Sequence, residues 1–248
     1  CGLCLVCVPF CVRLRVRFRS GKRLPDEPLC LGDRCIRHLR LAGLRDGRHL
    51  LVKTVPAGRG PAPAVPQVPA GPDVEETAGK RSKMATFQDL LKTAHDDALF
   101  EHYATAQLVS VDVETGAVQP VGAPSMLMSV KPAPDGAHLL VTRAARPFSH
   151  RVPFYYFPRS IEVWSAGGEL VRTVAALPVS DEVPPQGVPT GPREVAWQPL
   201  EPAALVWTEA LDGGDPLVEV PHRERLMALA APFQGEPREV ARVGQRFE

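Results

Sequence analysis

Aromatic residues and long apolar runs are scarce in this sequence of 248 residues. Phe, Trp and Tyr together make up 6% of the chain, and no apolar run reaches the roughly 18 residues that indicate a transmembrane helix. We therefore expect a soluble chain without a membrane partner. Neither sign of charge is in excess, because 29 Lys and Arg stand against 28 Asp and Glu. A nucleic-acid partner, which favours a strongly basic surface, is not expected either.

The sequence also lacks a recognisable active-site motif. No serine stands in the G-x-S-x-G frame of a nucleophile elbow. The seven histidines are scattered, and His95 and His102, about two helical turns apart, have no third ligand that would complete a metal site. We expect no catalytic residue, no metal and no cofactor in this chain.

Six cysteines are too few for a disulfide scaffold in a chain of this length. Cys1, Cys4, Cys7 and Cys11 have the C-x2-C-x2-C-x3-C spacing of some iron–sulfur proteins, but no proline follows the fourth cysteine and the run has no second copy. An electron-transfer module built on these cysteines therefore stays an alternative to an unstructured or non-native tail.

The N-terminal segment, residues 1–31, differs in composition from the rest of the chain. It begins with Cys1 rather than Met, which we interpret as a fragment or an incomplete gene model. Its apolar stretch precedes its basic stretch, the reverse of a secretory signal. Residues 13–19 (RLRVRFR) alternate strictly and predict an edge strand with a solvated basic face. We expect this Cys- and Arg-rich segment to be disordered or non-native.

Proline and glycine, by contrast, are abundant, with 27 and 20 residues, and they divide the chain into short strands. The pattern is clearest in residues 134–175. A Pro-Asp-Gly turn precedes a predicted strand over residues 138–143, and a connection leads to a second strand over residues 161–164. A Gly-Gly turn then leads to a third strand over residues 170–174.

This unit occurs three times along the chain. Its turn and first strand recur as DGRHLLVKT (46–54), DGAHLLVTR (135–143) and, without the glycine, EPAALVWTE (201–209). Its hairpin recurs over residues 108–121, 161–174 and 226–240, and a further inner strand recurs over residues 128–134 and 194–200. Repeated four-stranded antiparallel units are typical of β-propeller blades, whereas a β-sandwich would give short strands without a repeated order. We predict a mainly β fold, an incomplete β-propeller of about three four-stranded blades over residues 32–248.

One connection, residues 55–107, is too long for a blade loop and is predicted to be an insertion. Its first half, PAGRGPAPAVPQVPAGP, is a semi-rigid Pro/Gly linker. Its second half is predicted to be helical, with Thr86 as the N-cap, Asp89 three residues on, and a continuation over residues 94–104. We expect this helix to pack on the rim of a blade or on another domain.

The segment most typical of a binding surface is the loop RPFSHRVPFYYFPR, residues 146–159. Arg146, Arg151 and Arg159 are interleaved with aromatic residues, and guanidinium groups bind carboxylates through paired hydrogen bonds. These three arginines are the candidate substrate-binding residues. The alternative is a loop packed by its own aromatic side chains, with the arginines at its rim. The DGGD sequence at 212–215 hints at calcium, but we interpret it as a tight turn.

Four strings of residues resemble the glutamyl endopeptidase branch of the prolyl oligopeptidase-like serine peptidases. They are TFQDLLKTAHDDALFEHYATAQL (86–108), RPFSHRVPFYYFPRSIEVW (146–164), VPTGPREVAW (188–197) and WTEALDGGDPLVEVPHRERLMAL (207–229). The resemblance covers residues 32–247 and leaves out residues 1–31. It implies an N-terminal propeller that caps a C-terminal α/β-hydrolase domain, and this chain contains none of that domain's Ser-Asp-His triad.

The resemblance implies a function for this chain as one part of a larger enzyme. We expect the non-catalytic, substrate-gating portion of a serine peptidase that hydrolyses peptides after glutamate, inactive alone, with the hydrolase domain and peptide substrates as its partners. Arg146, Arg151 and Arg159 would attract acidic substrate. The alternative is a freestanding propeller that binds another protein and has no enzymatic activity. The sequence predicts no single compartment, since the resemblance allows a plastid or a bacterial cytoplasm or periplasm.

Overall fold

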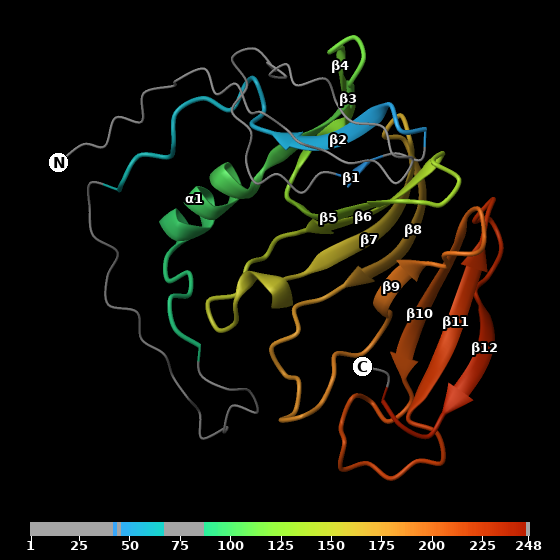
Figure 1. Cartoon of the computed structure of the whole chain (residues 1–248). Helices are drawn as coiled ribbons and strands as arrows, with labels where there is room; N and C mark the ends of the chain where they lie inside the picture. The colour runs from blue at the N-terminus through green and yellow to red at the C-terminus, as the bar shows by residue number, and fades with distance from the viewer. Residues whose placement is uncertain (1–41, 44–45, 67–86, 247–248) are drawn as a thin grey trace.

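The architecture is known from a computed structural model, which describes residues 42–43, 46–66 and 87–246. Strands β1 to β12 of this part form three four-stranded antiparallel sheets, placed one beside the next as the blades of an incomplete propeller (Figure 1). In each sheet the strands follow one another in chain order, so every blade is an antiparallel meander. The mainly β, three-bladed fold predicted from the repeats is confirmed.

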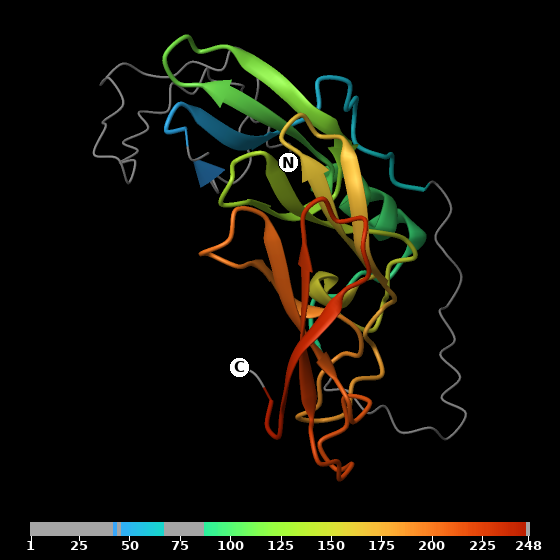
Figure 2. The same cartoon turned by 90° about the vertical axis from the view of Figure 1, so that its right-hand side faces the viewer.

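The three blades follow one another along the chain. Blade 1 consists of β1 (Ala42–Gly43), β2 (His49–Thr54), β3 (Ala106–Asp112) and β4 (Val118–Ser125). Blade 2 consists of β5 (Leu127–Pro132), β6 (His138–Ala144), β7 (Arg159–Ser165) and β8 (Leu170–Leu177). Blade 3 consists of β9 (Arg193–Trp197), β10 (Ala204–Ala210), β11 (Glu224–Ala230) and β12 (Arg238–Val243). The view in Figure 2 shows the blades stacked in this order.

The second strand of blade 2, β6, shows why its sequence is a continuous apolar run. Leu139 and Val141 contact the cluster shared with blade 1, whereas Leu140 contacts the cluster shared with blade 3. Each of these side chains is at most 2% exposed. Successive side chains of a strand point to opposite faces of the sheet, so a strand with a blade on each side buries every residue of its centre.

The Asp-Gly turn that precedes β2 and β6 is the same structure in both blades. Asp135 Oδ1 accepts hydrogen bonds from the backbone N–H groups of Ala137 and His138, and Asp135 Oδ2 lies 2.8 Å from His138 Nδ1. Asp46 makes the equivalent contacts to Arg48 and to His49, the first residue of β2. Gly136 has a φ of 72°, a left-handed conformation that glycine adopts without a steric penalty. The repeated DGxH letters therefore encode a repeated turn.

Two glycines bring blades 1 and 2 into close contact. Gly168, in the β7–β8 hairpin, lies against Gly122 of β4, and a Cβ atom added to Gly168 would stand 2.0 Å from the Gly122 backbone nitrogen. A Cβ atom on Gly122 would meet the ring of Trp164 at 2.6 Å. The hairpin of one blade is thus fixed against the outer strand of the other.

Helix α1 (Ala94–Ala104) starts later than the sequence predicted. Its N-cap is Thr93, whose side chain accepts a hydrogen bond from the Asp96 N–H, while the Asp96 carboxylate accepts one from the Thr93 N–H. Residues 87–92 are not helical, and Asp89 has a φ of 56°. The predicted start at Thr86 is therefore wrong, because the capping box is formed by the later Thr-x-x-Asp sequence.

The long connection between β2 and β3 leaves blade 1 and returns to it at two residues that are paired with each other in the sheet. Thr54, the last residue of β2, is paired with Gln107 of β3. The Thr54 hydroxyl also donates to the Gln107 carbonyl at 3.2 Å. The N-terminal cysteines and residues 13–19 lie outside the described residues, and the predicted domain boundaries stay predictions.

Candidate functional site

The longest connections of the described chain emerge at one end of the blades. They are the segment containing α1, the loop 145–158 between β6 and β7, and the β8–β9 connection 178–192. Figure 1 shows α1 beside the loop 145–158, and the Ser180 N–H donates to the Tyr156 carbonyl at 2.9 Å. The candidate substrate-binding arginines lie within this group of loops or next to it.

A cluster of aromatic rings holds α1 against the loop. Phe100 of α1 makes edge-to-face contacts with Phe148 and Phe157, at centroid separations of 5.0 and 5.6 Å. Phe148 and Phe157 are stacked on one another and at most 9% exposed. The alternative prediction, a loop packed by its own aromatic residues, is thus correct for these rings, and the helix completes the packing.

Arg146 and Arg151 both bind carboxylates of other segments. Arg146 donates from Nε and Nη2 to Glu101 Oε2 of α1, at 2.8 and 2.6 Å, and its guanidinium lies 4.7 Å from the centre of the Phe148 ring. Arg151 Nη1 lies 3.6 Å from Asp181 Oδ2 in the β8–β9 connection. The sequence alone gave no signal for either carboxylate, because both partners are distant along the chain.

His150 adds a third basic group to the same surface. Its Nε2 lies 2.9 Å from Asp97 Oδ1, one helical turn before Glu101 on α1. The basic groups of the loop and the acidic groups of the helix therefore form two parallel pairs, Arg146–Glu101 and His150–Asp97. These side chains, apart from the largely buried Asp97, are 40–47% exposed, so solvent reaches both pairs.

Arg159 has a different environment from the other two arginines. Its Nη1 donates to the Tyr155 carbonyl at 2.6 Å rather than to a carboxylate. Burial lowers the pKa of Arg159, and the nearby negative charge of Glu194 partly offsets this effect. Arg159 begins β7, where it pairs with Ala144, two residues before Arg146. The structure thus places Arg159 at the base of the loop, as a support for its backbone.

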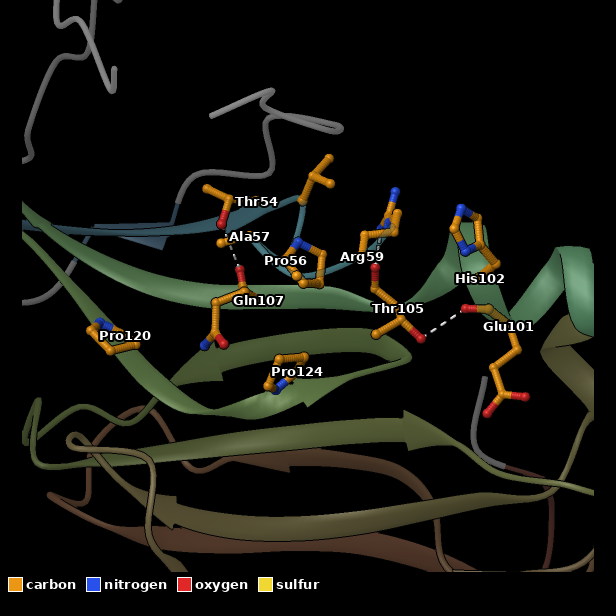
Figure 3. Close-up of a pocket in the computed structure, with 12 residues that line it drawn as sticks. Thr54, Pro56, Ala57, Arg59, Glu101, His102, Thr105, Gln107, Pro120 and Pro124 are labelled. Carbon is orange, nitrogen blue, oxygen red and sulfur yellow. Dashed lines mark hydrogen bonds between the residues drawn. The ribbon is translucent and has the colours of Figure 1, made fainter. Parts of the chain in front are cut away.

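A cavity of about 590 Å³ lies beside this surface. Its wall is formed by the turn that follows β2, the last turn of α1, the start of β3, and prolines of β4. The lining includes Pro56, Pro120, Pro124, Gln107, His102 and Glu101. Figure 3 shows His102 and Glu101 at one end of this row and Pro120 at the other. Glu101 therefore belongs both to the cavity and to the ion pair with Arg146.

Arg59 caps the C-terminal end of α1, which borders the cavity. Its Nη2 donates to the carbonyl of Thr105, the C-cap of α1. The Thr105 N–H and hydroxyl both donate to the Glu101 carbonyl, at 3.0 and 2.7 Å. The backbone on this side of the cavity is thus hydrogen-bonded, which fixes Glu101 at the start of the last helical turn.

The other candidate sites of the sequence have structural roles. Asp212 Oδ1 accepts from the Gly214 N–H at 3.0 Å, as expected for a tight turn. Its carboxylate is also bound by Arg223 and Arg246. His102 contacts the ring of Tyr103. Within the described residues, no group of three His, Cys, Asp or Glu side chains is placed to hold a metal ion. Also within them, no helix has the length and apolarity to cross a membrane.

Two curated relatives match the chain in sequence. The chain is 40% identical over 195 residues to the "Probable glutamyl endopeptidase, chloroplastic" of Oryza sativa subsp. japonica, which covers 77% of this chain and 21% of that protein. It is 40% identical over 199 residues to the protein of the same name from Arabidopsis thaliana, with coverages of 79% and 20%. The chain thus spans about a fifth of the length of the curated relatives it matches.

No protein-family model matches the chain. Among solved structures, the acylaminoacyl peptidase of Pyrococcus horikoshii is similar over 91% of this chain and 27% of that one, with a TM-score of 0.44 and 14% sequence identity.

Proposed function

We propose that this chain is the substrate-gating propeller portion of a serine peptidase. The premise is that the chain is a homologue of the plant probable glutamyl endopeptidases over more than three quarters of its own length. In this proposal the chain supplies no catalytic group. It receives acidic peptide segments at the surface formed by α1 and the loop 145–158. A hydrolase domain supplies the nucleophile, the oxyanion hole and the general base.

The observation that carries the proposal is the pairing of the loop's basic groups with side-chain carboxylates. Arg146, His150 and Arg151 each face a carboxylate from another segment of the chain. A glutamate side chain presents the same chemical group, and Arg146 already binds one with two nitrogens. A surface with this arrangement selects acidic side chains, which agrees with the name of the two relatives.

Exposure of these groups makes the surface accessible to a ligand. The side chains of Arg146 and Arg151 are 47% and 54% exposed, so each can exchange one carboxylate partner for another. Exposed ion pairs contribute little to folding stability, roughly 0–1 kcal/mol. We infer that Arg146 and Arg151 contact substrate, and that Arg159 positions the loop from its base through its bond to the Tyr155 carbonyl.

Peptide binding tests this proposal on the chain itself. We expect a fluorescein-labelled peptide with several glutamates to bind more tightly than the same peptide with glutamines, measured by anisotropy. Arg146→Glu with Arg151→Glu is expected to weaken the glutamate peptide about tenfold or more and to leave the glutamine peptide unchanged. Arg238→Glu, at an exposed position of β12, is the matched control. Equal binding of both peptides to the wild-type chain would contradict the proposal.

The partnership with a hydrolase domain has a separate test. Sequencing the transcript beyond the codon for Glu248 is expected to reveal an in-frame G-x-S-x-G motif within a hydrolase domain. A stop codon at that point would instead support a freestanding propeller that binds other proteins. Both relatives carry the word chloroplastic in their names, so we propose the plastid as the compartment to examine first.

A further inference from the structure

We propose that Glu101 is an internal competitor for the acidic substrate: its carboxylate occupies Arg146 in the way a glutamate of a bound peptide would. This inference rests on the proposed function, in which Arg146 receives an acidic side chain. It assigns a regulatory role to helix α1, whose residues 97–101 (DALFE) lie on the loop as a short acidic peptide.

Residues 97–101 contact the loop through the kinds of side chain that an acidic peptide would use in a binding site. Asp97 and Glu101 are one helical turn apart and meet His150 and Arg146 respectively. Between them, Phe100 inserts its ring among the aromatic residues of the loop. Two carboxylates and one aromatic anchor are thus the groups by which residues 97–101 hold this surface, and of these only the Glu101 carboxylate is exchanged in the proposal.

The Glu101 side chain can leave Arg146 without loss of the helix. Both partners are nearly half exposed, so water replaces the lost hydrogen bonds on each side. The helix stays anchored by the Thr93 capping box at its start, by Phe100 in the aromatic cluster, and by Arg59 at the Thr105 carbonyl. Rotation of one side chain therefore frees the guanidinium, which remains positioned over the Phe148 ring.

The cavity provides room for the rest of the peptide. Glu101 lines one end of the roughly 590 Å³ space, and the apolar faces of Pro56, Pro120 and Pro124 line its wall. This volume is in the range of small-ligand sites, roughly 300–1,000 Å³, and so can hold a few side chains of a peptide. Arg146 lies outside the cavity lining but is bound to Glu101, which belongs to it, so in this proposal a peptide seated in the cavity extends past Glu101 and places its own carboxylate on Arg146. The ligand class is thus a short peptide with a glutamate next to apolar residues.

Removal of the Glu101 charge tests the inference. We expect Glu101→Gln to bind the glutamate peptide about two- to fivefold more tightly than the wild-type chain, the effect of losing one surface competitor. Binding of the glutamine peptide is expected to stay the same. Glu236→Gln, at an exposed position between β11 and β12, is the matched control and should leave both affinities unchanged.

The outcomes separate this inference from the function on which it rests. If Glu101→Gln binds the glutamate peptide as the wild type does, while Arg146→Glu weakens binding, the competitor role is wrong and the acid-binding surface stands. If neither variant changes binding, both ideas fail. Glu101→Asp, which keeps the charge but shortens the side chain, should give an intermediate gain. Circular dichroism of each variant checks that α1 and the sheets remain folded.

Discussion

At the scale of the residue, the contact between Gly122 and Gly168 limits which side chains the blade 1–blade 2 boundary can accept. A Cβ atom on Gly168 would stand 2.0 Å from one backbone atom of Gly122 and 2.7 Å from another. Because these are backbone atoms, no side-chain rotation relieves the overlap. Gly168 also has a φ of 92°, which L side chains rarely adopt.

We therefore expect Gly168→Ala to lower the free energy of unfolding by about 2–4 kcal/mol, through strain at positive φ and displacement of the hairpin. Gly116→Ala is the matched control, since Gly116 has a φ of 71° but no atom within 4 Å of the added Cβ. Its cost should be that of the backbone conformation alone, about 1–2 kcal/mol. Urea unfolding measures both, and equal losses would show that the interblade contact adds nothing.

The candidate site illustrates what single residues in a sequence can and cannot predict. The spacing of arginines and aromatic residues in the loop 146–159 predicted a carboxylate-binding surface, and in the structure Arg146 and Arg151 lie beside carboxylates of this chain itself. Its partners Glu101 and Asp181 were not predicted, because each lies more than 20 positions away and no local pattern links them to the loop. Only the three-dimensional path of the insertion shows that the helix supplies the acid.

At the scale of the element, the strands were predictable because each is set by its own turn. The Asp-Gly sequence before β6 fixes the start of the strand through backbone hydrogen bonds, and the Gly-Gly sequence before β8 fixes the hairpin. The third copy retains the strand but has Glu201-Pro202 at the turn, and its Pro202 carbonyl accepts from the Asp135 N–H instead. The turn of blade 2 is thereby bonded to blade 3.

Helix α1 was harder to place because two Thr-x-x-Asp sequences occur close together. Both have the spacing of a capping box, at Thr86 and at Thr93. Tertiary contacts decide between them: Phe87 and Leu91 pack around the aromatic cluster from a non-helical segment. A helix that started at Thr86 would move these side chains away from the aromatic cluster. Packing against the cluster, rather than local helix propensity, therefore decides where the helix starts.

We expect Thr93→Ala to destabilise α1 selectively, by about 1 kcal/mol, through loss of the side-chain bond to the Asp96 N–H. Hydrogen exchange of the α1 amides is the measurement, and it should accelerate about fivefold while the strand amides stay unchanged. Asp96→Ala removes the other half of the capping box and should have a similar effect. Unchanged exchange in both variants would mean that tertiary contacts alone hold the helix start.

At the scale of the whole molecule, every blade contains a carboxylate bound by arginine. Hydrogen bonds from Arg48 hold the pKa of Asp112 in blade 1 well below its ordinary value. In blade 2, burial alone would raise the pKa of Glu162, but hydrogen bonds from Arg143 and Trp164 outweigh burial and lower it. Asp212 of blade 3 also has a lowered pKa, for the same balance of reasons.

These pKa values give the folded protein a defined response to acid. A carboxyl group whose pKa is lower in the folded state stabilises that state fully above its unfolded pKa, 3.8 for Asp and 4.5 for Glu. The contribution is lost as the pH falls below these values toward the folded pKa. We therefore expect the contribution of these carboxyl groups to the free energy of unfolding to be nearly constant above about pH 5. The free energy of unfolding, measured in urea, should fall steeply between about pH 4.5 and 2.

The variant Glu162→Gln separates the loss of stability caused by protonation of Glu162 from the other effects of acid on the protein. The variant should lose about 1–3 kcal/mol at pH 7, because Arg143 then lacks its charged partner. It should also lose less stability than the wild type between pH 7 and pH 3.5. Glu236→Gln, on the exposed β11–β12 turn, should retain the full acid response. An acid response that is identical in all three proteins would rule out Glu162 as a contributor.

The pairing of Thr54 with Gln107 has a consequence for how this protein can diverge. Because residues 55–105 connect the end of β2 to the start of β3, where these two strands are already paired, the meander of blade 1 is complete without them. Whatever occupies that span, whether a tight turn, the present helix or an entire foreign domain, can be exchanged as a cassette while the propeller is conserved. The peptide selectivity proposed for this surface and the stability of the scaffold would then be separable traits, open to independent selection in nature and to independent engineering in the laboratory.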